Sequence, residues 1–125
     1  MASIIPTFAL VVLGAASTWA ADSGSATYRQ LSASEIRKTV IGMAITDDAH
    51  WSDHFHRDGT LKSYDLGRLK RGTWKLDSNE LCLTRFGTST TDCFEIWVAR
   101  DAVQYRRDGV VVADGYLRAI PDTGK

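Results

Sequence analysis

The sequence predicts a mainly β protein, in which an antiparallel meander closes into a small barrel or half-barrel behind one short N-terminal helix. Turn signals such as Asp58-Gly59 and Asp108-Gly109 recur along the chain. The runs between them are five to nine residues long and rich in Val, Ile, Thr, Tyr, Phe and Trp. Short strands at this spacing are typical of an antiparallel sheet that closes or nearly closes.

The N-terminal segment is typical of a cleavable secretory signal. Residues 1–20 contain no Lys, Arg, Asp or Glu, and their apolar run is shorter than the roughly 20 residues that span a bilayer. Small residues lie at the positions that a signal peptidase reads if cleavage follows Ala20. We therefore predict export to the periplasm or the medium, with no membrane span after cleavage. The alternative is a retained membrane anchor.

Removal of the signal leaves 105 of the 125 residues, which suits one domain. No internal repeat or low-complexity tract divides this part of the sequence. We expect a flexible lead over residues 21–30, a single β-rich domain over residues 31–120 and a tail over residues 121–125.

One helix is predicted in the exported part, over about residues 32–41. Ser32 or Ser34 can cap its first turn, and a glycine follows at the position where the helix should end. Ile36 and Val40 place apolar side chains on one face. The helix should therefore pack against the sheet.

Two cysteines, Cys82 and Cys93, lie in the exported part. A hairpin with Gly87-Thr88 at its tip places them opposite each other, in a hydrogen-bonded pair with Cα atoms about 5.5 Å apart. Two thiols that meet in an oxidising compartment join, so we predict a disulfide. The alternatives are two free buried thiols or a zinc site.

Alternation along the predicted strands separates an apolar face from a polar one. In residues 72–77 Trp74 and Leu76 share a face, and in residues 93–98 the apolar side chains recur at every second position. Four residues from such faces are candidates for the core or for a ligand-facing wall: Trp74, Leu83, Ile96 and Tyr105.

The order of short motifs resembles a group of small exported bacterial proteins of unknown function. The motifs are F-H-R-D-G-T at 55–60, G-T-W at 72–74, L-C-L at 81–83, D-C-F at 92–94 and R-R-D-G at 106–109. The resemblance covers about residues 31–120 and implies a lipocalin-like layout, in which G-x-W places a Trp against the barrel floor. Here the G-x-W motif sits in the middle of the sequence rather than on the first strand. The resemblance implies no catalytic residues.

All three histidines lie in TDDAHWSDHFHRDG, residues 46–59. On a strand, His50, His54 and His56 share one face, while Trp51 and Phe55 point to the core with Asp53. We predict an edge or rim strand whose histidines are in water and bind no structural metal. The alternatives are a zinc site, with Asp47, Asp48 and Asp53 in support, and a catalytic or pH-sensing role.

The charge balance argues against nucleic-acid binding, and the absence of known catalytic motifs argues against an enzyme. Fifteen basic and fifteen acidic residues balance, whereas nucleic-acid binding needs clustered Lys and Arg. The nearest cluster is GRLKRG at 67–72. The sequence has no G-x-S-x-G, G-x-G-x-x-G or P-loop, and we expect no catalytic residue and no cofactor.

Three functions follow from these expectations. The first is an exported, non-enzymatic barrel that binds a small or lipidic ligand. The second is a protein-binding envelope factor, such as a hydrolase inhibitor, which an exposed aromatic patch around Trp97 would favour. The third is a histidine-based metal-dependent protein.

Overall fold

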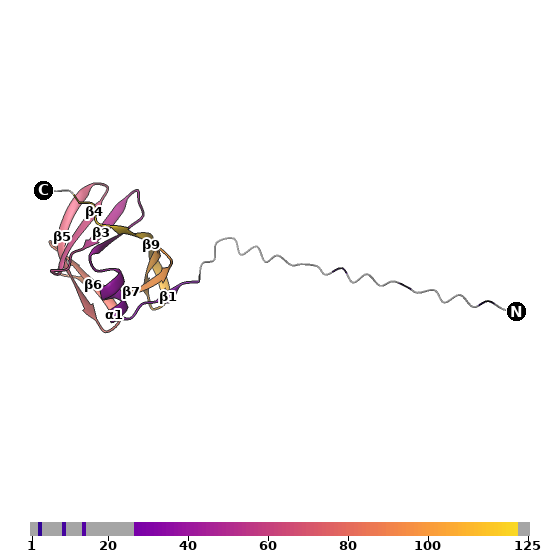
Figure 1. Ribbon diagram of the computed structural model, residues 1–125. Coiled ribbons are helices and arrows are strands. Elements are labelled where there is room, and N and C mark those ends of the chain that lie inside the picture. Colours follow the sequence, from indigo (N-terminus) through magenta and orange to yellow (C-terminus); the bar gives the residue numbers. More distant parts are fainter. Residues whose placement is uncertain (1–2, 4–8, 10–13, 15–26, 123–125) are drawn as a thin grey trace.

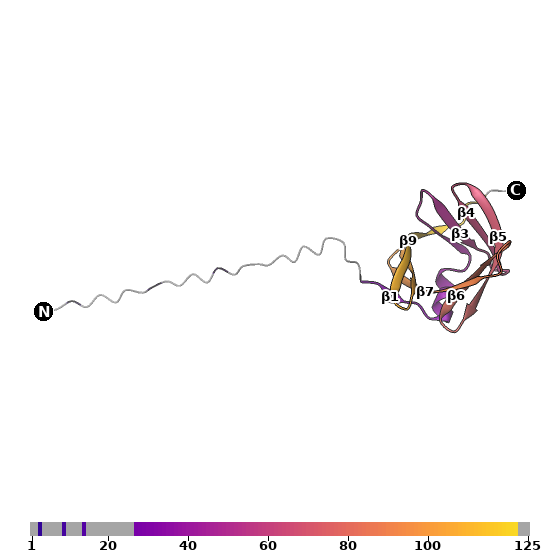
Figure 2. The ribbon, with the colours of Figure 1, turned by 180° about the vertical axis from the view of Figure 1, so that it is seen from behind.

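The computed structural model describes residues 27–122 and the isolated positions 3, 9 and 14. The predicted signal peptide, the predicted lead up to residue 26 and residues 123–125 of the predicted tail lie outside the described residues. Figures 1 and 2 show the folded part from two opposite sides.

The described part forms a closed antiparallel barrel. Strands β2 to β9 pair in succession, and β9 returns to pair with β2, which closes a barrel of eight strands. This confirms the predicted fold class, a mainly β protein in a lipocalin-like layout with one short helix in the described residues. The elements are β1 (Arg29–Gln30), α1 (Ala33–Thr39), β2 (Met43–Thr46), β3 (Trp51–Phe55), β4 (Thr60–Asp65), β5 (Arg68–Asp77), β6 (Glu80–Arg85), β7 (Thr91–Ala99), β8 (Ala102–Arg107) and β9 (Val110–Ala119).

Strand β1 corrects one expectation. Residues 21–30 were predicted to be a flexible lead, but Arg29 and Gln30 pair with Val98 and Trp97 of β7. The reason is a free edge: β7 pairs with β6 only as far as Glu95, and β1 supplies partners to the backbone beyond it.

Helix α1 begins as the sequence predicts and ends earlier. Ser32 caps it, and its hydroxyl accepts the N–H of Glu35 at 3.2 Å while the Glu35 carboxylate accepts the N–H of Ser32. This capping box satisfies two amide groups of the first turn. The backbone then leaves the helix through Val40 and reaches Gly42 with a φ of +91°, a conformation that favours glycine.

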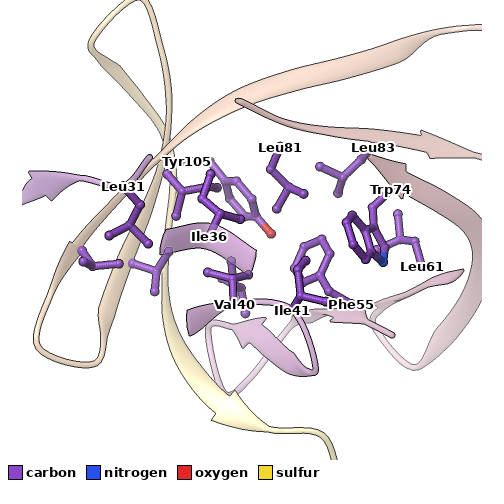
Figure 3. Packing of buried hydrophobic residues seen from close by; sticks show 14 residues of the cluster. Leu31, Ile36, Val40, Ile41, Phe55, Leu61, Trp74, Leu81, Leu83 and Tyr105 are labelled. Carbon is purple, nitrogen blue, oxygen red and sulfur yellow. The ribbon is translucent and has the colours of Figure 1, made fainter. Parts of the chain in front are cut away.

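The helix closes one end of the barrel from inside. Ile36 and Val40 are fully buried and join an apolar cluster with side chains from the strands. In Figure 3 both residues face that cluster. The apolar face predicted from the sequence thus fills the barrel at this end.

Trp74 packs in the filled part of the barrel, as predicted, and is only 8% exposed. Figure 3 shows its ring beside Leu61 and Leu83. Its indole Nε1 donates a hydrogen bond of 2.7 Å to the carbonyl of His56 in the β3–β4 turn. A buried Trp therefore has its one polar group satisfied.

Gly72, two residues before Trp74, allows β5 to bend between two partners. It pairs with Leu61 of β4 on one side and with Arg85 of β6 on the other. A Cβ atom at this position would lie 2.1 Å from the carbonyl oxygen of Thr84. The strands can approach this closely only because residue 72 has no side chain.

The disulfide between Cys82 and Cys93 is present, and the two residues are register partners as predicted. Two details of the predicted hairpin are wrong. The Cα atoms are 3.9 Å apart, closer to a non-hydrogen-bonded pair than to the expected 5.5 Å. The turn is also displaced, because the N–H of Thr88 donates to the carbonyl of Arg85 and places Phe86 and Gly87 at its centre.

Gly87 explains this displacement. Its φ is +90°, the value that the third residue of a type II turn requires. The loop therefore runs over residues 86–90, longer than a two-residue tip, and still keeps the cysteines opposite each other.

Within the described residues, no helix has the length and apolar character needed to cross a membrane.

Candidate functional site

The two ends of the barrel differ. Because the strands alternate in direction, α1 and the turns at 56–59, 78–79 and 100–101 lie at one end, which we call the closed end. The turns at 47–50, 66–67, 86–90 and 108–109 lie at the other, the open end. The apolar cluster fills the barrel beside α1 (Figure 3).

A cavity of about 320 Å³ lies toward the open end; we call it the open-end cavity. This volume is at the small end of the range for ligand pockets, roughly 300–1,000 Å³. Most of its wall is apolar and comes from both sides of the barrel. The apolar lining residues are Trp51, Leu83, Phe94, Tyr105, Val112 and Ala113.

A polar cluster lies in the wall of the open-end cavity. Asp53 is only 6% exposed, and its Oδ1 accepts a hydrogen bond of 2.7 Å from the Ser63 hydroxyl. Its Oδ2 accepts the Tyr105 hydroxyl at 3.0 Å. Arg85 completes the cluster through an ion pair of 3.3 Å with Asp53. The carboxylate is thus buried with three donors, which offsets the cost of removing it from water.

Tyr105 joins the polar cluster to the aromatic wall. Its ring centroid lies 5.2 Å from that of Phe94 and 6.0 Å from that of Trp51. Burial raises the pKa of Tyr105 well above its usual range, and the negative charge of Asp53 adds to this shift. Tyr105 therefore stays protonated and donates to Asp53 at any physiological pH.

All four candidate residues from the sequence belong to the buried apolar cluster, and two of them also line the open-end cavity. Leu83 and Tyr105 line the open-end cavity. Trp74 and Ile96 belong to the filled cluster and do not line it.

Sequence reasoning missed the polar cluster of Asp53, Ser63 and Arg85. One signal pointed to it: the strand alternation places Asp53 on the same inward face as Trp51 and Phe55. A charged residue at an inward position needs a buried partner. The partners come from other strands and could not be identified by spacing.

The prediction for the histidine strand is wrong in two respects. β3 pairs with β2 on one side and β4 on the other, so it is not an edge. His54 is 9% exposed and counts as buried, although it faces outward as the alternation requires. It is covered because the backbone after β9 passes nearby: Ile120 and Pro121 line the same outer groove as His54.

That outer groove, of about 370 Å³, brings His54 and His56 together with their ring centroids 6.5 Å apart. The Nε2 atom of His56 is buried and has no hydrogen-bond partner among the described residues. Burial lowers the pKa of His54, and the neighbouring charge of His56 lowers it further. His54 therefore favours the neutral imidazole.

His50 lies in a separate loop and does not join the other two histidines. Its Nδ1 lies 2.9 Å from the carboxylate of Asp47, which also accepts the N–H groups of Ala49, His50 and Trp51. The hydrogen bond from the Trp51 N–H is the main reason why the pKa of Asp47 lies far below its usual range. Asp47 thus organises the turn into β3.

The described residues contain no group of three or more His, Cys, Asp or Glu side chains arranged to hold a metal ion. The expectation that the histidines bind no structural metal stays a prediction, because only a titration tests it.

A second outer hollow, of about 480 Å³, lies over β2, β3 and the end of β9. Its charged lining residues Arg118 and Asp48 already pair with each other at 2.9 Å, and Arg118 also contacts Asp101 at 2.8 Å. It is also less enclosed by the barrel than the open-end cavity, whose polar cluster is buried. The open-end cavity is therefore the stronger candidate site.

Fold and site together define a class of protein: a small disulfide-linked β-barrel, filled at one end and hollow at the other. No protein-family model, curated protein or solved structure matches the sequence.

Proposed function

We propose that the protein is an exported, non-enzymatic binding module that holds a small, mainly apolar ligand in the open-end cavity. One observation carries the proposal: a cavity of about 320 Å³ with aromatic and aliphatic walls contains a buried, preorganised polar cluster. Apolar walls with a few fixed polar groups are typical of ligand sites.

The lining of the cavity indicates what the ligand should carry. Its charged residues balance, with Asp53 and Asp65 against Lys70 and Arg85, so the ligand needs no net charge. Arg85 donates from its Nε to Ser63 and from its Nη2 to Asp53, while its Nη1 donates to none of the described residues. A ligand oxygen near the cavity mouth could accept a hydrogen bond from that Nη1.

The cellular location forms part of the proposal. The disulfide favours a compartment outside the reducing cytoplasm. The periplasm or the medium is the finer proposal, and it rests on the predicted signal in residues 1–20.

The two other functions have less support. The ring of Trp97 is covered by Arg106, whose guanidinium carbon lies 4.1 Å from the ring centroid, and its Nε1 donates to Glu95. The exposed aromatic patch that would favour a hydrolase inhibitor is therefore not found around Trp97. The metal-dependent alternative has two neighbouring histidines, His54 and His56, where a zinc site takes four ligands.

Titration with the uncharged fluorophore N-phenyl-1-naphthylamine tests the proposal. We expect its emission to rise on binding, with energy transfer from Trp51 in the cavity wall. Ala113→Trp fills the cavity and should abolish binding while the barrel still folds. Ala119→Trp, on the same strand but exposed, is the matched control and should bind as the parent does.

Two results would contradict the proposal. One is parent-like binding in the Ala113→Trp variant, confirmed as folded by its circular dichroism. The other is loss of binding only in the Ala119→Trp variant, which would place the fluorophore in the outer hollow that Ala119 lines.

A further inference from the structure

Exposed apolar side chains gather at the open end. Among the described residues, seven large apolar side chains are exposed, and only Tyr116 lies away from the three hairpin ends β4–β5, β6–β7 and β8–β9. Single exposed apolar residues are ordinary, but a group of them marks an interaction surface. The six residues at the hairpin ends are Leu66, Leu69, Phe86, Val110, Val111 and Val112.

Each hairpin end presents one strongly exposed apolar side chain. Leu66 is 73% exposed, Phe86 65% and Val110 67%. We call these three residues the tips. They follow one another around the barrel, because β5 pairs with β6 and β7 pairs with β8.

The three hairpin ends also share contacts around the cavity mouth. The N–H of Phe86 donates to the carbonyl of Arg71 at 2.8 Å, and Arg107 lies 3.7 Å from Asp92 across the next pair of hairpins. The open-end cavity is lined by residues of all three: Lys70, Arg85 and Val112. The tips therefore stand around one opening.

The β4–β5 end adds unpaired positive charge. Arg68, Lys70 and Arg71 are exposed, as is every residue from 65 to 71. No ion pair within the described residues includes any of the three cations, although six other ion pairs are present. These side chains are free to meet negative charge outside the protein.

We propose that the open end docks on a membrane surface that carries anionic lipid headgroups. Leu66, Phe86 and Val110 enter the interface between headgroups and acyl chains, and Arg68, Lys70 and Arg71 contact the headgroups. Basic residues beside apolar ones are the combination that anionic bilayers attract. This inference goes beyond the proposed ligand binding and holds even if the cavity binds nothing.

A second copy of the protein fits this surface less well. In a twofold dimer the same patch faces itself, so a dimer centred on the β4–β5 end would bring two copies of the cluster Arg68, Lys70 and Arg71 together. Like charges brought together in this way are repelled.

A protein partner also fits less well. The residues that dominate protein interfaces are mainly Trp, Tyr and Arg, whereas Leu and Val are under-represented and Lys is depleted. The tips are two aliphatic residues and one Phe. Mainly aliphatic tips beside basic side chains match a lipid surface better.

Co-flotation with lipid vesicles tests the proposal. The exported protein, its N-terminus established by intact mass, is mixed with vesicles of phosphatidylcholine alone or of equal parts phosphatidylcholine and phosphatidylglycerol. We expect binding to the anionic vesicles, weakened by salt because exposed charges are screened, and far weaker binding to the neutral vesicles.

Two variants separate the apolar from the charged contribution. The tip variant, Leu66→Asn, Phe86→Ser and Val110→Ser, should lose binding to both kinds of vesicle. The charge variant, Arg68→Gln, Lys70→Gln and Arg71→Gln, should bind anionic vesicles about 100-fold more weakly, because each basic residue near such a surface contributes roughly fivefold.

A matched control removes the same charge at the closed end. Arg37, Lys38 and Arg100 are exposed there, and their replacement by Gln should leave binding within about twofold of the parent, since charges more than a Debye length away are screened. An equal loss in this control, or parent-like binding by the tip variant, would overturn the proposal. So would absence of binding to anionic vesicles, and a dimer in solution that the tip variant dissolves would assign the surface to a second copy.

Discussion

The two ends of this barrel are built from the same strands but differ in the burial of their apolar side chains. At the closed end, apolar side chains of α1 such as Ile36 and Val40 enter the barrel and are fully buried. At the open end no helix of the described residues covers the barrel, and Leu66, Phe86 and Val110 remain exposed. The turns at the closed end, 56–59, 78–79 and 100–101, carry no exposed large apolar side chain in the described structure.

The difference between the ends comes from α1, which lies outside the strand meander and buries its apolar side chains at the closed end. A barrel of eight strands has an interior just wide enough for side chains to fill, and α1 supplies the additional apolar groups at one end. Toward the other end, the interior holds the buried polar cluster of Asp53 and a cavity. Stability should therefore come mainly from the closed end and binding from the open end.

The largest effect is expected where the barrel is filled. Trp74→Ala should lower the free energy of unfolding by about 3–5 kcal/mol, because it removes a large buried ring and leaves a void. Val112→Ala, an exposed change at the open end, should alter it by less than about 0.5 kcal/mol. Equilibrium unfolding in urea measures both, and similar losses in the two variants would remove the contrast between the ends.

The disulfide should have the next largest effect. In the chain-entropy model, a loop closed between Cys82 and Cys93 stabilises the fold by roughly 2.5–3 kcal/mol. The double variant Cys82→Ser and Cys93→Ser should lose about this amount and melt at a lower temperature. If the parent is equally stable before and after reduction, the bond contributes nothing to folding.

The polar cluster at the open-end cavity should contribute less. Asp53→Ala removes the shared acceptor of Ser63, Tyr105 and Arg85. Buried donors without an acceptor should lower the free energy of unfolding by about 1–3 kcal/mol. The control Asp114→Ala removes an exposed carboxylate and should cost less than about 0.5 kcal/mol; equal losses would show that burial of Asp53 is unimportant.

The smallest effect is expected in the pH dependence of stability, and it comes from His54 on the outer face of β3. Burial lowers the pKa of His54 below its ordinary 6.5, the charges of His56 and Lys62 lower it further, and Asp53 opposes them. Below pH 6.5 the unfolded protein therefore binds more protons than the folded protein. Stability should fall as the pH drops below this value and level off once the folded protein is protonated too.

His54→Gln should reduce that pH dependence, and His50→Gln, an exposed position, should preserve it. The measurement is the urea midpoint at several pH values on either side of 6.5. An unchanged slope in the His54 variant would mean that the burial of this imidazole does not affect folding.

Local sequence patterns predicted the structure correctly wherever the interacting residues lie close together in the sequence. Ser32 and Glu35 lie three residues apart and form the cap that starts α1. Strand alternation placed Trp51 and Phe55 inside, and hairpin pairing brought Cys82 opposite Cys93. Each of these results depends on residues close in sequence, whose spacing sets which side chains meet.

Local patterns failed where distant segments meet. β1 was predicted to be part of a flexible lead, because nothing in residues 29–30 indicates the free edge of β7 that they fill. The histidine strand was predicted to lie at an edge, yet β2 and β4 flank it and the backbone after β9 covers His54. Burial of an outward side chain depends on what passes over it, which the strand pattern does not contain.

The sequence by itself determined the fold class, the start of the helix, the cysteine pair and the inward faces of β3, β5, β7 and β8, because these follow from spacing and turn chemistry. Only the tertiary structure decided which residues of the buried core also line a cavity: Leu83 and Tyr105 do, whereas Trp74 and Ile96 do not. It also decided that Asp53 meets Tyr105, 52 residues away in the sequence. Barrel closure brings such distant residues together. No local pattern predicts how much of the barrel interior α1 fills, and therefore where the cavity begins.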